Sequence, residues 1–120
     1  MLERAGPSAS VATFGHYHLV ERDSGLVVGG IGFLGVPHAG VVEMGYGVVP
    51  SRQGRGYATE ALDGLLRFAW EADPTLESVV AGTDGDNVAS QRVLEKTGFT
   101  LESTNPADTT RLYRILRVPS

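Results

Sequence analysis

The clearest pattern of apolar positions in this chain follows Gly56 and has the period of a helix. Its apolar side chains recur at three- and four-residue spacing: Ala58, Ala61, Leu62, Leu65, Leu66, Ala69 and Trp70. Such spacing places one apolar stripe along a helix that packs on a core. The Asp73-Pro74 pair ends the pattern, because proline cannot continue a helix. We therefore predict a helix from just after Gly56 to just before Asp73.

A second, shorter helix is predicted to run to about Lys96. Asp86 or Asn87 can cap its N-terminus, and Thr97-Gly98 ends it. Asn87 and Ser90 are three residues apart, so their side chains share one face near the start of this helix.

The other apolar segments are short and are typical of strands. We expect strands over residues 14–22, 26–35, 41–49, 76–83, 99–103 and 110–118. The turn Asp23-Ser24-Gly25 joins the first two into a hairpin. In the second strand, Gly29, Gly30 and Gly32 indicate a bulge or a close backbone approach.

Side chains of the third strand alternate between two faces. One face is predicted to carry Val41, Glu43, Gly45 and Gly47. The other is predicted to carry Val42, Met44, Tyr46 and Val48.

The resulting order is β-β-β-α-β-α-β-β, which predicts an α/β (α+β) protein with a mixed sheet and helices packed on it. A length of 120 residues suits one core. We expect a flexible N-terminal segment over residues 1–13 and a single domain over residues 14–118.

Composition narrows the function classes. Hydrophobic residues make up 42% of the chain and charged residues 20%, as in ordinary globular proteins. The sequence has no apolar run near the length of a membrane span, and residues 1–13 lack the apolar core of a signal peptide. The chain has no cysteine, which excludes disulfides and cysteine-based sites, and its net charge of −4 argues against broad nucleic-acid binding. We expect a cytoplasmic protein without a nucleic-acid or membrane partner.

The segment of residues 48–60, VVPSRQGRGYATE, joins a strand to the first helix through a glycine-rich turn. Strand, turn and helix in this order direct several N–H groups at one phosphate. A dinucleotide fingerprint fails because Thr59 stands where glycine or alanine is needed, and a nucleotide P-loop fails because the chain has no Gly-Lys pair. The pattern Q-x-x-G-x-A is met by Gln53-Gly54-Arg55-Gly56-Tyr57-Ala58.

That last pattern resembles the acyl-CoA pyrophosphate loop of the GCN5-related N-acetyltransferase (GNAT) superfamily, in particular its ribosomal-protein alanine N-acetyltransferase branch. The segment 87–99, NVASQRVLEKTGF, resembles the N-x-x-S-x-x-V-L-E-K-x-G-F segment of the same branch. Together the two motifs cover roughly residues 41–103, in the order strand, helix, strand, helix that the family has.

The resemblance implies acetyl-CoA as co-substrate and no metal. It implies a cofactor-binding set of Val48, Val49, Arg52, Gln53, Gly54, Arg55, Gly56, Tyr57, Ala58, Thr59, Asn87 and Ser90. In this set the N–H groups of residues 54–58 receive the pyrophosphate, with added charge from Arg52 and Arg55. The pantetheine arm lies along residues 44–49, where that strand splays from the strand at 76–83, and the N–H of Val48 or Val49 polarises the thioester carbonyl.

The implied chemistry is direct attack by an amine on the thioester, with Glu43 as the base and Ser90 as the hydrogen-bond donor to the leaving sulfur. Alternatives remain open at both positions. Glu43 is equally an exposed strand residue in a cross-strand ion pair. Tyr46 is an alternative donor, although a core position is the commoner role for such a tyrosine, and Tyr113 is too distant in sequence to assign.

The chain also departs from the family. The family's usual first strand and first two helices have only about thirteen residues in their place, so we expect an open acceptor pocket or completion by a second subunit as a homodimer. Gly47 replaces a bulky aromatic residue and widens the cleft. A non-catalytic acyl-CoA-binding module is the alternative function, and the amine acceptor stays open between a protein N-terminus and a small molecule. His16 and His18 share a strand face, but solvated histidines are the commoner explanation than a metal site.

Overall fold

The computed structural model describes residues 2–4, 16–48, 53 and 56–118. Its elements are β1 (Leu2–Arg4), β2 (His16–Val20), β3 (Val27–Phe33), β4 (Val41–Val48), α1 (Tyr57–Ala72), β5 (Ser78–Thr83), α2 (Val88–Thr97), β6 (Thr100–Thr104) and β7 (Arg111–Leu116). The order from β2 to β7 confirms the prediction, and both helices begin and end within a residue of the expected positions. Most strands end one or two residues inside their predicted limits. Residues 14, 15 and 49 of the predicted strands lie outside the described residues.

The N-terminal segment corrects one prediction. We expected no strand before Phe14, but Leu2–Arg4 pairs antiparallel with β2 in the register Leu2↔Leu19 and Arg4↔Tyr17. A three-residue strand has no periodicity of its own and forms only because a partner edge is available. Residues 5–15 lie outside the described part of the chain.

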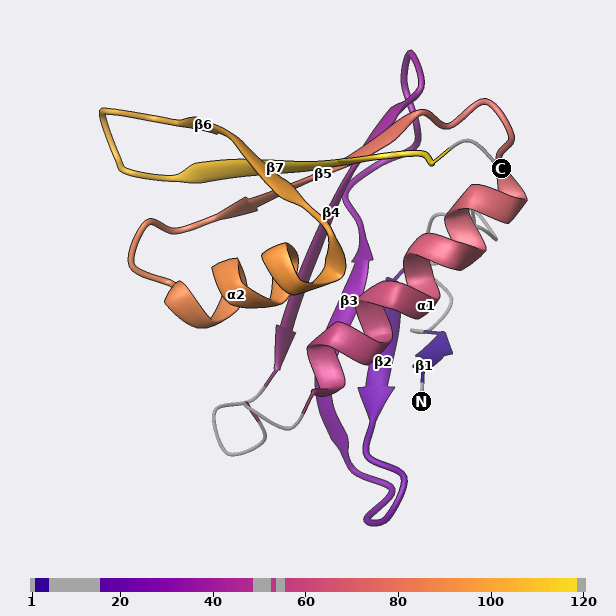
Figure 1. Cartoon of the computed structure of the whole chain (residues 1–120). Helices are drawn as coiled ribbons and strands as arrows, with labels where there is room; N and C mark the ends of the chain where they lie inside the picture. The colour runs from indigo at the N-terminus through magenta and orange to yellow at the C-terminus, as the bar shows by residue number, and fades with distance from the viewer. Residues whose placement is uncertain (1, 5–15, 49–52, 54–55, 119–120) are drawn as a thin grey trace.

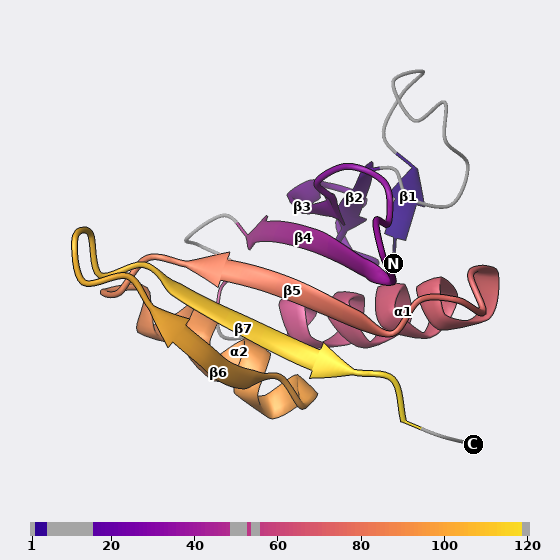
Figure 2. The same cartoon turned by 90° about the horizontal axis from the view of Figure 1, so that it is seen from above.

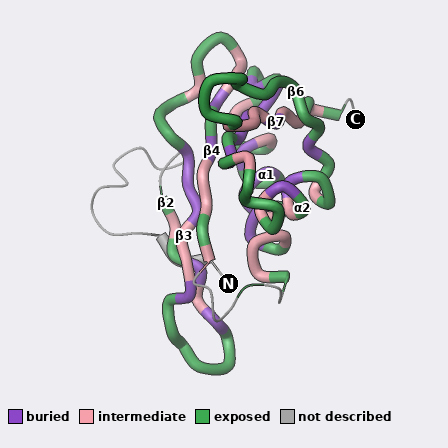
Figure 3. The backbone as a smooth tube through the Cα atoms, turned by 90° about the vertical axis from the view of Figure 1, so that its left-hand side faces the viewer, coloured by how far each residue is buried: buried purple, intermediate pink, exposed green. Residues whose placement is uncertain are grey.

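The strands in the described residues form one mixed seven-stranded sheet in the order β1-β2-β3-β4-β5-β7-β6. Both helices lie on the same face of this sheet, as the view from above shows (Figure 2). The apolar stripe of α1 explains this placement, since its buried side chains are the predicted ones: Ala61, Leu62, Leu65, Leu66 and Ala69. They join a core that includes Phe33, Met44, Val79, Leu94 and Tyr113. Figure 3 shows how buried and exposed positions are distributed along the backbone. Neither described helix is long and apolar enough to cross a membrane.

The central feature for function is the divergence of β4 from β5 (Figure 1). These parallel strands pair from Val41↔Ser78 to Met44↔Ala81, where the ladder ends. Beyond Met44, β4 continues to Val48 and pairs only with β3 among the described strands. The predicted splaying of the two strands is therefore present.

The unpaired side of β4 presents main-chain groups. The N–H of Leu34 donates to the oxygen of Glu43, so odd-numbered residues of β4 direct their main-chain groups toward β3. The N–H of Ser78 donates to the oxygen of Gly40, which confirms that even-numbered residues face β5. The N–H and C=O groups of Tyr46 and Val48 therefore point into the opening between β4 and β5.

The predicted close approach within the second strand lies at Gly29. A Cβ atom at Gly29 would overlap the carbonyl oxygen of Gly47 on β4. The pairing of β2 with β3 also shifts register between Leu19 and Val20, as expected for a bulge.

Candidate functional site

The turn before α1 places a helix N-terminus beside the opening in the sheet. Gly56 precedes the helix with φ 80° and ψ 3°, a left-handed conformation that favours glycine. Its carbonyl accepts the first helical bond from Glu60 at 3.0 Å. The N–H groups of Ala58 and Thr59, in the first turn of α1, have no carbonyl within the helix to bond, so they can bind an anion.

Gln53 ties this turn to the end of β4. Its Nε2 donates to the carbonyl oxygen of Val48 at 3.0 Å. The predicted site residues Val49, Arg52, Gly54 and Arg55 lie outside the described residues.

The second motif forms the N-terminus of α2. Asn87 is its N-cap, and Asn87 Oδ1 accepts a hydrogen bond from the N–H of Ser90 at 3.1 Å. Of the two predicted caps, Asn87 is the one used. Gly98 ends the helix with φ 110°, as the sequence predicts.

The two motifs, thirty residues apart in sequence, line one pocket of about 340 Å³. Its described walls come from the end of β4, the start of α1 and one face of α2: Tyr46, Gly47, Val48, Gln53, Gly56, Tyr57, Ala58, Thr59, Asn87, Ala89, Ser90, Arg92, Val93 and Lys96. No Asp or Glu is among these lining residues, whereas Arg92 and Lys96 are both cationic. The pocket thus combines two helix N-termini with positive charge, which suits an anionic ligand.

Sequence reasoning did not assign Arg92, Val93 and Lys96 to this site. A signal was available, because residues 89, 92, 93 and 96 have the spacing of a single helix face. That face begins one residue before Ser90, which was assigned.

Tyr46 lies between the sheet and α2 and contacts Ser90 directly. Its hydroxyl lies 3.0 Å from the main-chain oxygen of Ser90 and 2.8 Å from Ser90 Oγ. Burial raises the pKa of Tyr46 above its usual 10.0, and the hydrogen bond with Ser90 partly opposes this rise. The tyrosine is half-buried, so it is neither a fully enclosed core residue nor a free surface group.

Glu43 does not lie in this pocket. It is exposed on the face of β4 opposite to Tyr46 and stands in register with Val80 of β5. The alternation predicted for β4 is confirmed, since Val42 and Met44 are buried on the helix side. Glu43 and Ser90 are therefore on opposite faces of the sheet, and Glu43 lies in the paired part of β4, just before the opening between β4 and β5.

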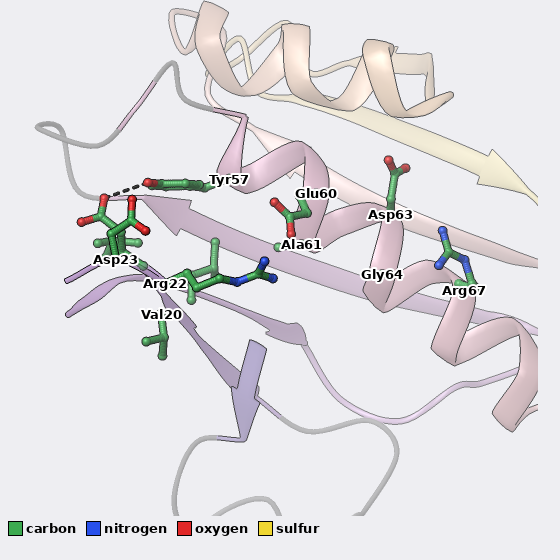
Figure 4. Close-up of a pocket in the computed structure, with 12 residues that line it drawn as sticks. Val20, Arg22, Asp23, Tyr57, Glu60, Ala61, Asp63, Gly64 and Arg67 are labelled. Carbon is green, nitrogen blue, oxygen red and sulfur yellow. Dashed lines mark hydrogen bonds between the residues drawn. The ribbon is translucent and has the colours of Figure 1, made fainter. Parts of the chain in front are cut away.

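A second, larger pocket of about 620 Å³ lies between the end of β2 and the first half of α1 (Figure 4). Four carboxylates and two arginines line it: Glu21, Asp23, Glu60, Asp63, Arg22 and Arg67. The hydroxyl of Tyr57, which lines both pockets, donates to Glu21 Oε2 at 2.8 Å. Its excess of acids makes this larger pocket the poorer candidate for a phosphate.

The histidines lie apart from both pockets. His16 and His18 are exposed on β2, opposite Gly32 and Gly30 of β3. Within the ranges that the structure describes, no three His, Cys, Asp or Glu side chains are grouped so that they could hold a metal ion.

Comparison with known proteins identifies the family of this chain. The family model described as acetyltransferase (GNAT) domain matches residues 2–100. An uncharacterized N-acetyltransferase of Bacillus subtilis, YjdG, is 37% identical over 89 residues, which are 73% of this chain and 52% of that protein. A second, YnaD, is 28% identical over 86 residues, 72% of this chain and 50% of that protein. The chain thus spans about half the length of the curated relatives it matches.

Solved structures share the fold. RimJ of Mycobacterium smegmatis, solved with CoA-disulfide, has a TM-score of 0.71 and 27% identity, covering 84% of this chain and 53% of that one. Ribosomal-protein-S5-alanine acetyltransferase of Vibrio fischeri has a TM-score of 0.77 and 16% identity, covering 88% and 62%. The family model matches most of the chain, YjdG is similar in sequence, and the solved structures share the fold. The chain therefore belongs to the GNAT acetyltransferase family.

Proposed function

We propose that this chain is an acetyl-CoA-dependent N-acetyltransferase domain that acts on a primary amine. One observation carries the proposal: residues of both sequence motifs line the same cationic pocket. The N-termini of α1 and α2 and the unpaired side of β4 meet at this pocket. The neighbour RimJ was solved with CoA-disulfide, which supports a CoA ligand for this fold.

The pyrophosphate would lie at the N-terminus of α1. The N–H groups of Ala58 and Thr59 lie in the first turn of that helix, and no atom of the described residues lies within 4 Å of a would-be Cβ at Gly56. A ligand can therefore approach the main chain closely at this point. Gly54 and Arg55 would complete the cradle, and Arg92 and Lys96 of α2 would add charge from the facing wall.

The pantetheine arm would lie along β4, where a paired strand is missing. The N–H groups of Tyr46 and Val48 and the C=O of Tyr46 face this opening, so amides of the arm can bond to them as a neighbouring strand would. Among the two predicted oxyanion donors, the alternation of β4 favours the N–H of Val48, which points into the opening.

The acceptor would enter from the other face of the sheet, where Glu43 is exposed. The amine nitrogen forms a bond to the thioester carbonyl carbon, and the carbon–sulfur bond then breaks with the electron pair leaving on sulfur. Glu43, directly or through water, takes the proton that the amine loses. The Ser90 hydroxyl, on the pocket side, donates a hydrogen bond to the thiolate, which water then protonates.

A non-catalytic acyl-CoA-binding module is the second candidate. The observation in its favour is that Glu43 and Ser90 lie on opposite faces of the sheet, and only Ser90 lines the pocket that both motifs share. Both candidates predict CoA binding, and only the first predicts turnover.

Steady-state release of CoA thiol from acetyl-CoA, with a panel of peptide N-termini and small amines, separates the two. We expect amine-dependent thiol release that falls at least about tenfold in Glu43→Gln, with CoA affinity unchanged. Glu95→Gln, an exposed acid on α2 outside the pocket lining, is the matched control. CoA binding without thiol release for any amine would favour the binding module, and undiminished turnover in Glu43→Gln would remove Glu43 as base.

Self-association is a further part of this proposal. Several large apolar side chains are more than half exposed: Leu26, Val27, Leu34, Val36, Leu116 and Val118. Burying them against a second copy would be favourable. Sedimentation equilibrium should show a dimer, and a monomer at all concentrations would contradict it.

A further inference from the structure

The hydroxyl of Tyr46 has one hydrogen and two oxygen atoms of Ser90 within hydrogen-bond distance. The main-chain oxygen is 3.0 Å away and Oγ is 2.8 Å away. Either hydroxyl can be the donor of the shorter contact. Two arrangements of the hydrogens are therefore possible, and they differ in where the hydrogen of Ser90 points.

In the first arrangement, Tyr46 donates to the main-chain oxygen and Ser90 donates to Tyr46. The hydrogen of Ser90 is then used inside the protein. In the second arrangement, Tyr46 donates to Ser90 Oγ, and the hydrogen of Ser90 is free to point into the pocket that Ser90 lines.

Helix geometry favours the second arrangement once an acceptor occupies the pocket. The main-chain oxygen of Ser90 is in the first turn of α2, where the N–H of Leu94 can satisfy it. This oxygen therefore has a hydrogen-bond donor even when Tyr46 donates elsewhere. An anionic sulfur in the pocket would give the hydrogen of Ser90 a charged acceptor, and hydrogen bonds to charged acceptors are stronger than neutral ones.

We propose that Tyr46 is a positioning residue, which donates to Ser90 Oγ and thereby directs the Ser90 hydroxyl toward the sulfur of bound CoA. This inference rests on the proposed function, because it needs CoA in the pocket. The side chain of Tyr46 touches neither the thioester nor the acceptor in this account, and it acts on the sulfur through Ser90 alone.

The protonation state of Tyr46 is compatible with this role. Burial raises the pKa of Tyr46 above its usual 10.0, so the phenol keeps its hydrogen at neutral pH and can donate it to Ser90. A hydrogen bond to the thiolate favours the charged form and lowers the pKa of the bound thiol. Loss of Tyr46's hydroxyl should weaken that effect even though Ser90 is intact.

The thiol pKa of bound CoA is therefore the readout, followed by the ultraviolet absorbance of the thiolate in a pH titration. It requires no turnover, and a merely structural role of Tyr46 would not move it. The variants are Tyr46→Phe, Ser90→Ala and the double variant. Tyr17→Phe removes a hydroxyl from β2, outside the pocket lining, and is the matched control.

We expect Ser90→Ala to raise the bound thiol's pKa by roughly half a unit to one unit, and Tyr46→Phe to raise it by a comparable amount. The double variant should match Ser90→Ala, because Tyr46 has no path to the sulfur without Ser90. Tyr17→Phe should leave the pKa of the thiol unchanged.

Three results would overturn the inference. An unchanged thiol pKa in Tyr46→Phe would show that Tyr46 does not orient Ser90. Additive shifts in the double variant would show that it acts on the sulfur independently. Failure of the unmodified protein to bind CoA would overturn the proposed function as well, whereas the first two results leave CoA binding intact and concern Tyr46 alone.

Discussion

Asn87 Oδ1 accepts a hydrogen bond from the N–H of Ser90 at 3.1 Å, so one side chain both closes the N-terminus of α2 and fixes the residue that faces the pocket. The same Ser90 is held from the sheet by Tyr46. A site residue in this chain is thus placed by a local cap and a distant strand together.

Replacing Asn87 with alanine should lower the free energy of unfolding by about 1 kcal/mol, since an N–H at the helix start loses its acceptor. Asn87→Asp keeps an acceptor and should retain most of the stability. Urea denaturation of the three proteins is the measurement. Equal stability of Asn87→Ala and the unmodified chain would show that the cap is dispensable.

Arg117 should be a strong determinant of stability because it caps the distant C-terminus of α1. Its Nε donates to the oxygen of Leu76 at 2.6 Å, and Nη2 donates to the oxygens of Trp70 at 2.9 Å and Asp73 at 2.6 Å. Its guanidinium also lies 5.0 Å from the centre of the Trp70 ring.

Arg117→Ala should therefore cost about 2–3 kcal/mol of unfolding free energy. Arg117→Lys should recover only part of this, because an ammonium cannot match the planar guanidinium. Chemical denaturation measures both, and a lysine variant as stable as arginine would contradict the geometric explanation.

Gly29 and Gly30, adjacent on β3, should respond differently to alanine. A Cβ at Gly29 overlaps the oxygen of Gly47, whereas a Cβ at Gly30 comes no closer than 3.6 Å to its nearest neighbour, the oxygen of Tyr17. Gly29→Ala should destabilise by about 1–3 kcal/mol, and Gly30→Ala by less than about 0.5 kcal/mol. Thermal unfolding of the pair tests this, and similar losses at both positions would count against the close strand approach.

The turn after α1 should make stability depend on pH. Hydrogen bonds from the Thr75 side chain, at 2.6 Å, and from its N–H, at 2.9 Å, hold the pKa of Asp73 below the usual 3.8. A depressed folded pKa stabilises the protein above the unfolded value and loses this effect as the pH falls through the folded pKa.

Thr75→Ala removes the hydroxyl that makes the larger contribution. It should be less stable than the unmodified chain above about pH 4, and the gap should narrow as the pH falls further. Urea unfolding across this range measures the gap. A gap that stays constant with pH would mean that the Thr75 hydroxyl does not act through the charge of Asp73.

Local patterns predicted the helices well because each carries its own signals. The stripe of α1 and the Asn87 and Gly98 ends of α2 need no distant partner. The short strand β1 needed one, and its three residues show no alternation that sequence reasoning could use. Most predicted strands were one or two residues too long because strand pairing ends where the partner strand ends, and apolar residues can continue beyond that point.

The sequence predicted some features of the candidate site and missed others, again because some depend on distant partners. The motifs singled out Gly56, Asn87 and Ser90, which the structure brings to one pocket, and the alternation along β4 predicted the face on which Glu43 lies. The contact between Tyr46 and Ser90 joins residues 44 positions apart, so only the packing of α2 on the sheet could reveal it. Binding by these residues remains a prediction until it is measured.

The central claim is that CoA binds at the turn before α1, and calorimetric titration of CoA tests it most directly. Gly56 and Gly25 offer a matched pair, with φ of 80° and 71° and no atom of the described part of the chain within 4 Å of a Cβ at either. Valine at either position imposes similar backbone strain, but only Gly56 lines the pocket that both motifs share. We predict CoA binding to the unmodified chain and to Gly25→Val, with affinity at least about tenfold weaker in Gly56→Val. Absence of CoA binding to the unmodified chain, or equal affinity in Gly56→Val, would contradict the account.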